Sequence, residues 1–131
     1  MSKGTRREQQ CCEIFENAGY MTYRPATVRF GENDVFGLFD LVAMKTDAPP
    51  WYVQVKSNGA YGIEAWCEKV REIFPFEHGR AAYAVPYDQY GWRLIRVGST
   101  DRCTVYDERD TDDNMGEGIT NYLREKAESE Q

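Results

Sequence analysis

The sequence predicts an α/β (α+β) fold in which a mixed β-sheet is flanked by helices. Runs of aromatic and β-branched residues recur between residues 20 and 97, are bounded by turn residues, and are typical of strands. Two other stretches, 5–18 and 61–74, repeat their apolar residues at helical spacing. The resulting order, α-β-β-β-α-β-β-α, favours one sheet with a helix on each face.

Length and composition fit one compact domain. The chain has 131 residues, of which 41% are hydrophobic, so it can build a core. No apolar run approaches the roughly 20 residues that span a membrane, and the first ten residues contain no apolar signal segment. We therefore expect a cytoplasmic protein that does not associate with membranes. The four cysteines show no paired metal spacing and are expected to be reduced thiols.

The negative charge of the chain is confined to its C-terminal segment. The net charge is -6; residues 99–131 hold 10 acidic and 4 basic residues, whereas residues 1–98 hold 12 of each. We expect residues 99–131 to form an acidic extension, with a strand at Cys103–Tyr106, disorder over 107–114 and a short helix from about Ile119 to Ala127. Within residues 1–30, five bases face three acids. Both a local basic surface and an ordinary solvated helix are compatible with that excess.

The helix predicted over residues 5–18 carries one carboxylate on its inward side. Its apolar stripe consists of Cys11, Cys12, Phe15 and Ala18. Glu8 lies three and four residues before the two cysteines, so it is in line with this stripe. In the second helix the core-facing side is formed by Ile63, Trp66, Cys67, Val70 and Phe74.

Residues 35–44 and 51–57 are predicted to be neighbouring antiparallel strands. The first of them, VFGLFDLVAM, is apolar on both faces apart from Asp40, which is typical of a central strand covered on both sides. The short connection over 45–50 favours the antiparallel arrangement. Further strands are predicted at 20–28, 80–87 and 92–97.

Asp40 is the strongest indication of a functional site. An isolated carboxylate within an apolar strand costs several kcal/mol unless it is paired or bound to a metal. An even register would place Gln54 or Lys56 on the same face as Asp40, and Glu8 could approach from the helix. The alternative is a buried Asp40–Lys56 ion pair that serves only the fold.

Such a group of side chains suits metal-assisted hydrolysis of a phosphodiester. Hard oxygen ligands hold Mg²⁺, with Mn²⁺ as an alternative, and the metal polarises the phosphate and activates a water molecule. A lysine can orient that water or stabilise the charge that develops on the phosphate. Asp40 followed fourteen residues later by Gln54-x-Lys56 supplies these parts, although many chains contain this bare pattern by chance.

The surrounding segments make the pattern more specific. In order, they are KGTRRE at 3–8, NAGYMTYR at 17–24, FDLVAM at 39–44, VQVKS at 53–57 and a hairpin with Gly-Trp-Arg at 80–97. This series resembles the archaeal Holliday junction resolvases of the PD-(D/E)XK nuclease superfamily. The resemblance implies a restriction-endonuclease-like fold over residues 1–98, a homodimer, and a magnesium-dependent nuclease that acts on branched DNA in recombination or repair.

The resemblance also implies roles for individual residues. Glu8, Asp40, Gln54 and Lys56 match the catalytic positions, with Glu8, Asp40 and Gln54 as metal ligands, and we add the Val55 carbonyl as a further ligand. The residues expected to contact DNA phosphates are Lys3, Arg6, Arg7, Arg24 and Arg29.

Three departures from the family pattern bear on function. Phe39 stands where the family has proline. The loop between Arg24 and Asp40 is longer and lacks a serine that the resolvases often carry, which bears on junction specificity. Gln54 replaces a carboxylate and offers a carbonyl oxygen without charge; Glu64 or Glu68 is an alternative source of that charge. Two further readings therefore stay open: a nuclease fold that binds DNA or a partner without cutting, and a restriction- or repair-type nuclease.

Overall fold

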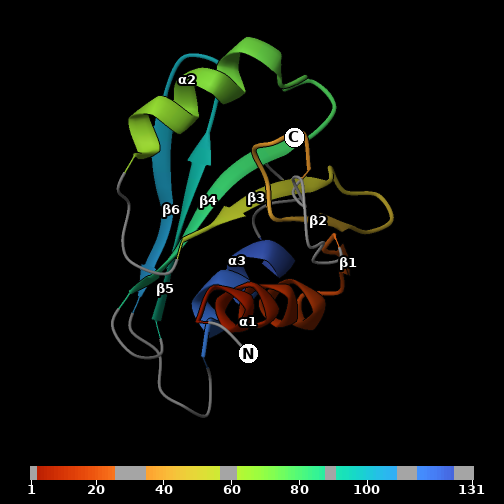
Figure 1. Cartoon of the computed structure of the whole chain (residues 1–131). Helices are drawn as coiled ribbons and strands as arrows, with labels where there is room; N and C mark the ends of the chain where they lie inside the picture. Colours follow the sequence, from red (N-terminus) through yellow and green to blue (C-terminus); the bar gives the residue numbers. More distant parts are fainter. Residues whose placement is uncertain (1–2, 26–34, 57–61, 88–90, 109–114, 126–131) are drawn as a thin grey trace.

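A computed structural model describes residues 3–25, 35–56, 62–87, 91–108 and 115–125, with residues 3–4, 87 and 102–108 described by their backbone alone (Figure 1). Within these described ranges, three helices and six strands follow one another. They are α1 (Lys3–Asn17), β1 (Met21–Tyr23), β2 (Leu41–Met44), β3 (Trp51–Val55), α2 (Ile63–Ile73), β4 (Arg80–Tyr87), β5 (Gly91–Val97), β6 (Arg102–Glu108) and α3 (Glu117–Glu125).

The strands form one mixed sheet in the order β1-β2-β3-β4-β5-β6. β3 and β4 are parallel, because α2 carries the chain back between them, and every other neighbouring pair is antiparallel. The predicted mixed sheet and the predicted antiparallel pairing of the strands around Asp40 and Gln54 are therefore confirmed.

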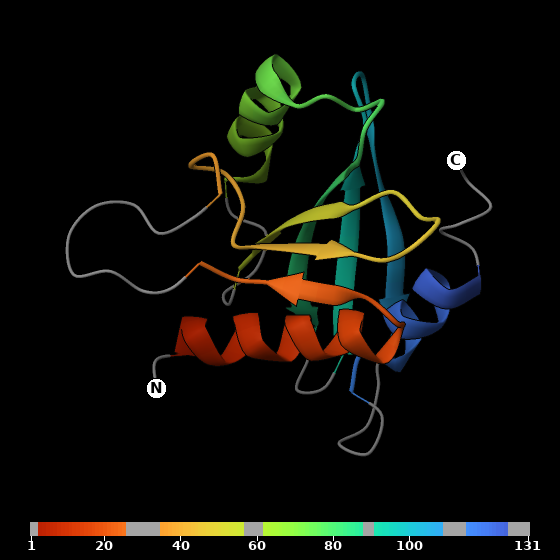
Figure 2. The same cartoon turned by 90° about the vertical axis from the view of Figure 1, so that its right-hand side faces the viewer.

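Helices cover both faces of this sheet. On one face, α1 and α3 pack with strand residues such as Trp51 and Leu94 in a single apolar cluster. On the other face, Trp66 and Val70 of α2 pack with a second cluster that includes Tyr83. Figures 1 and 2 show α1 and α3 beside each other on one side of the sheet, with α2 on the opposite side. The predicted apolar stripes of the first two helices are buried as expected.

The prediction of one continuous strand over 35–44 is wrong in its first half. Residues 35–39 form a tight turn in which the Val35 amide donates to the Phe39 carbonyl at 2.7 Å. Phe36 and Gly37 adopt left-handed backbone conformations, with φ of 57° and 71°, which no strand contains. Asp40 consequently lies where β2 begins, not in the middle of a strand, and is half-buried.

The C-terminal residues are part of the same sheet and core. β6 pairs with β5, and it extends to Glu108, two residues into the stretch expected to be disordered; residues 109–114 of that stretch lie outside the described residues. Ile119 and Leu123 of α3 are buried in the cluster that also contains α1. The Thr120 hydroxyl donates to the Ile14 carbonyl at 3.1 Å. The predicted strand and helix of this segment are both present.

No helix in the described part of the chain has the length and apolar character needed to cross a membrane.

Candidate metal centre and nucleic-acid surface

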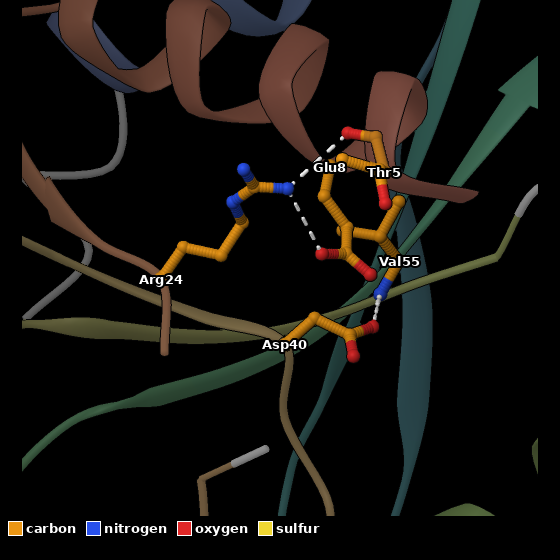
Figure 3. Close-up of polar contacts among 5 residues, drawn as sticks. All are labelled: Thr5, Glu8, Arg24, Asp40 and Val55. Carbon is orange, nitrogen blue, oxygen red and sulfur yellow. Dashed lines mark hydrogen bonds and ion pairs between the residues drawn. The ribbon is translucent and has the colours of Figure 1, made fainter. Parts of the chain in front are cut away.

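Where β2 and β3 separate, the Asp40 carboxylate accepts a hydrogen bond that a backbone carbonyl would accept in a regular sheet. The Asp40 amide donates to the Val53 carbonyl at 2.8 Å. Beyond that bond the Val55 amide donates to Oδ2 of Asp40, also at 2.8 Å (Figure 3). A hydrogen bond from a backbone amide to a charged carboxylate is one of the stronger kinds in proteins. The sheet therefore fixes the orientation of this carboxylate.

Glu8 reaches the same region from α1. Figure 3 shows its carboxylate directed toward Val55 and Asp40. Its Oε1 atom accepts from Nη1 of Arg24 at 3.2 Å, and the same nitrogen donates to the Thr5 carbonyl at 3.3 Å. This ion pair was not predicted from the sequence. The sequence does contain a signal for this pair. Glu8 lies on the inward side of the first helix, and Arg24 ends the strand that follows that helix.

The Cys11 thiol lies within the electrostatic influence of both carboxylates. Burial raises the pKa of its thiol well above the usual value, and the neighbouring Cys12, Asp40 and Glu8 raise it further. Both carboxylates thus act on one thiol beneath α1. Asp40 also acts on Tyr83, whose pKa is raised first by burial, then by Cys67 and then by Asp40. Tyr83 belongs to the cluster under α2, so the Asp40 carboxylate lies where it affects groups on both faces.

Gln54 lies on β3 between two residues that face α1. Val53 and Val55 belong to the apolar cluster under that helix, so the alternation of side chains turns Gln54 to the face that α2 covers. Leu41 is paired with Val53, yet the Asp40 amide also bonds to the Val53 carbonyl, so the regular register ends before Asp40. Gln54 is half-buried. The part of Gln54 in a site shared with Asp40 and Glu8 stays a prediction.

Lys56 follows β3 directly and its side chain is exposed. Its backbone amide donates to the Ala84 carbonyl at 3.0 Å, which continues the pairing with β4. An exposed lysine does not fit the buried Asp40–Lys56 ion pair that was considered as an alternative. Glu64 and Glu68 are also exposed, on α2.

The donors around Asp40 suit a hard divalent cation. Carboxylate, amide and carbonyl oxygens are the ligands of Mg²⁺ and Mn²⁺, whereas thiolate and imidazole favour zinc. In an extended strand the N–H and C=O of one residue point to the same side, so the Val55 carbonyl faces the side to which its amide donates. Within the described ranges, however, no three His, Cys, Asp or Glu side chains come together as a metal-binding group. The candidate set is therefore low in charge: two carboxylates, an amide oxygen and a backbone oxygen.

The expected DNA-contacting residues differ in their surroundings. Arg6 is exposed on α1. Arg7 is half-buried, its guanidinium lies 5.8 Å from the centroid of the Trp92 ring, and it donates to Gln10 at 3.0 Å. Burial, and then the neighbouring Arg6, lower the pKa of Arg7. Arg24 is held in its ion pair with Glu8. The Lys3 side chain and the whole of Arg29 lie outside the described residues.

Comparisons with known proteins found similarity to solved structures. The chain is similar to the structure of Archaeoglobus fulgidus Hjc, a Holliday junction resolvase from an archaeal hyperthermophile. The TM-score is 0.49, the sequence identity is 20%, and the similarity covers 79% of this chain and 84% of that one. No protein-family model matches the sequence, and no curated protein matches it. This is the family that the sequence motifs resemble; at this level of similarity it concerns the fold alone.

Proposed function

We propose that the protein is a magnesium-dependent endodeoxyribonuclease that cuts branched DNA such as a four-way junction. The observation that carries the proposal is the Asp40 carboxylate, oriented by the Val55 amide at the start of β2, with Glu8 directed toward it from α1 (Figure 3). Two carboxylates directed to one region are ligands of the kind that Mg²⁺ takes in proteins.

Each residue of the group has a role in this proposal. Asp40 and Glu8 supply the negative charge that holds the cation, and the Gln54 and Val55 carbonyl oxygens complete its protein ligands. The bound cation would polarise the scissile phosphate and offset its charge. Lys56, exposed beside the site, donates to a phosphate oxygen and stabilises the charge that develops there during attack by water.

A homodimer would suit symmetric cleavage of two strands, since a two-fold axis relates two identical sites. Met21, Tyr23 and Met44 are exposed. Met21 pairs with Met44 across β1 and β2, and all three side chains share the face opposite α1. This apolar surface supports self-association, because contiguous exposed apolar side chains mark interaction sites.

A second candidate is a nuclease fold that binds DNA without cutting it. Two observations favour it: Gln54 lacks the charge of the usual second acid, and Glu8 is already paired with Arg24. A third candidate, a restriction- or repair-type nuclease, would use the same residues on linear duplex DNA.

One assay separates these candidates. A labelled four-way junction and a linear duplex of matched sequence are incubated with the protein and Mg²⁺ or Mn²⁺, and cleavage is followed on denaturing gels. We expect cleavage of the junction alone. Cleavage of the duplex at an equal rate would favour the restriction- or repair-type nuclease, and binding of the junction without cleavage would favour the binding module.

Asp40→Asn is the control for the site. It should abolish cleavage but leave junction binding unchanged or tighter, because a charge that repels phosphate is removed. Unchanged cleavage by this variant would refute the site.

A further inference from the structure

The Arg24–Glu8 ion pair occupies one of the two carboxylates that the proposed metal site needs. A single nitrogen of Arg24, Nη1, contacts both Oε1 of Glu8 and the Thr5 carbonyl. The guanidinium is thus tied to the first turns of α1, and it offers its positive charge to the acid that would otherwise bind a cation.

This ion pair can open at little cost in stability. The Arg24 and Glu8 side chains are 27% and 28% exposed, and ion pairs with this access to water contribute little to stability. Arg24 also borders a polar surface groove with Gln9, Glu13 and Thr22. Within that groove Glu16 already accepts a hydrogen bond from Thr22. Arg24 is therefore partly open to solvent while it is paired with Glu8.

In a complex with metal and DNA, Glu8 and Arg24 would each make a stronger interaction than the one between them. A dication attracts a carboxylate more strongly than a guanidinium does, because its charge is twice as large. A phosphate accepts two parallel hydrogen bonds from a guanidinium, a geometry that lysine cannot reproduce.

We propose that Arg24 is a positioning residue that holds Glu8 while no cation is bound and passes to a DNA phosphate when a divalent cation takes Glu8. The inference rests on the proposed nuclease function, and it adds a coupling between the two ligands. A cation frees Arg24 for DNA, and DNA frees Glu8 for the cation, so each ligand tightens the binding of the other by the same factor.

The first test is a titration of the full chain with Mn²⁺ in the absence of DNA, followed by calorimetry and by the electron paramagnetic resonance signal of free Mn²⁺. Asp40→Asn sets the baseline, since the acidic residues of the C-terminal segment bind Mn²⁺ weakly in every variant. Arg24→Gln removes the competing charge. We expect the Asp40-dependent site to bind Mn²⁺ about threefold to tenfold more tightly in Arg24→Gln than in the wild type.

Two further variants separate competition from general electrostatics. Arg6→Gln removes an exposed charge from α1, the helix that carries Glu8, without breaking the Arg24–Glu8 ion pair. The Mn²⁺ affinity of this variant should change by less than about twofold, because exposed charges are screened. Arg24→Lys keeps the charge but replaces the planar guanidinium, whose Nη1 contacts both Glu8 and Thr5, with a shorter and more strongly hydrated ammonium group. Its affinity should therefore lie between those of the wild type and Arg24→Gln. Thermal melting of each variant verifies that it is folded.

The second test measures the coupling. Junction affinity is measured by fluorescence anisotropy with and without Ca²⁺, in a Lys56→Ala background that prevents cutting. The ratio of the two affinities should be at least about twofold larger when Arg24 is present than when the Arg24→Gln substitution is added, since only Arg24 links the two ligands.

The outcomes distinguish this inference from the proposed function. If neither the wild type nor Arg24→Gln shows Asp40-dependent Mn²⁺ binding, the proposed metal site is wrong and the inference falls with it. If both bind Mn²⁺ equally tightly, or if Arg6→Gln has the same effect as Arg24→Gln, the metal site stands and the inference alone is overturned.

Discussion

Gln54 determines how strongly the proposed site can hold a cation. It adjoins Val55, whose amide bonds to the Asp40 carboxylate, and as a proposed ligand its amide oxygen would coordinate the metal without contributing charge. Because Arg24 neutralises part of the charge of Glu8 in the unliganded protein, the site depends heavily on Asp40. In the proposed nuclease, metal affinity is therefore expected to limit activity more than the action of Lys56 does.

Gln54→Glu should strengthen the enzyme when the metal is limiting. A full negative charge near a dication is worth on the order of 1–4 kcal/mol at surface-like dielectric. Junction cleavage at low Mg²⁺ should rise accordingly, and the gain should shrink as Mg²⁺ saturates, which a titration of initial rate against Mg²⁺ measures.

Lys56→Ala in the Gln54→Glu background is the control and should remove the activity again. If Gln54→Glu instead loses an activity that the wild type has, the glutamine amide donates a hydrogen bond that a carboxylate cannot, and its role as a metal ligand is wrong.

Cys11 should make the protein less stable at alkaline pH. Its pKa in the folded protein is raised well above the ordinary value of 9.0, chiefly by burial. The unfolded chain therefore releases this proton at lower pH than the folded chain. The contribution of the neutral thiol to stability is complete below about pH 9 and is lost as the pH rises through the folded pKa.

The free energy of unfolding in urea should thus fall between pH 8 and pH 10 under reducing conditions. One such group contributes at most about 1.4 kcal/mol per pH unit. Cys11→Ala should have a shallower fall than the wild type, although Cys12 and Tyr83, whose pKa values are also raised, retain part of it. Equal slopes in the two proteins would show that the pKa of Cys11 is the same in the folded and the unfolded chain.

At the scale of elements, α3 is docked through one close approach of the backbone. Gly116 precedes the helix with φ of 73°, and a Cβ at this position would overlap the Ile14 side chain of α1. From there the Thr120 hydroxyl bonds to the Ile14 carbonyl, and Arg124 donates to the Asn17 carbonyl. The joint between α3 and α1 begins at a position that only glycine fits.

Gly116→Ala should therefore destabilise the protein by about 2–4 kcal/mol, from left-handed backbone strain together with overlap in a packed core. Gly19→Ala is a matched control, because Gly19 also has a positive φ but has no atom within 4 Å of an added Cβ. It should cost only the backbone term, about 1–2 kcal/mol. Urea unfolding measures both, and equal losses would mean that the contact with Ile14 relaxes without cost.

The helices were predictable because their apolar residues recur at helical spacing. Phe15 and Trp66, for instance, are buried as that spacing requires. The turn at 35–39 was not predictable, because a run of apolar residues has the same sequence pattern in a central strand and in a buried turn. Gly37 was the one local signal for it.

The site could be predicted only in part for a related reason. The hairpin pattern predicts that the strands beside Asp40 and Gln54 pair, as they do, but the observed register ends at Leu41 and Val53, before those two residues. The pairing of Arg24 with Glu8 depends on how β1 lies along α1, and periodicity identifies an apolar face without identifying what packs on it. The packing of α3 against α1 could not be predicted for the same reason, because the apolar face of α3 does not show which element it contacts.

For the whole molecule, the distribution of charge determines how it can meet DNA. The chain is acidic, with a net charge of -6, so any DNA track must be a local surface that keeps its bases exposed. The N-terminal surface of α1 beside Asp40 is the candidate. Its arginines are not equivalent, since Arg6 is exposed whereas Arg7 packs over the Trp92 ring.

Arg6→Ala and Arg7→Ala should therefore differ. Arg6→Ala should lower the slope of log affinity against log salt concentration by about one, because one phosphate contact and its released counterion are lost. Arg7→Ala should change the slope less. It should instead lower the free energy of unfolding by about 1 kcal/mol, because the guanidinium and its methylene stem cover the indole. Fluorescence anisotropy with a four-way junction over a salt series, paired with urea unfolding, measures both quantities. If Arg6→Ala leaves affinity and slope unchanged, the N-terminal surface is not the DNA track. If Arg7→Ala lowers the slope by a full unit without loss of stability, its guanidinium leaves Trp92 for a phosphate in the complex, and the distinction between the two arginines is wrong.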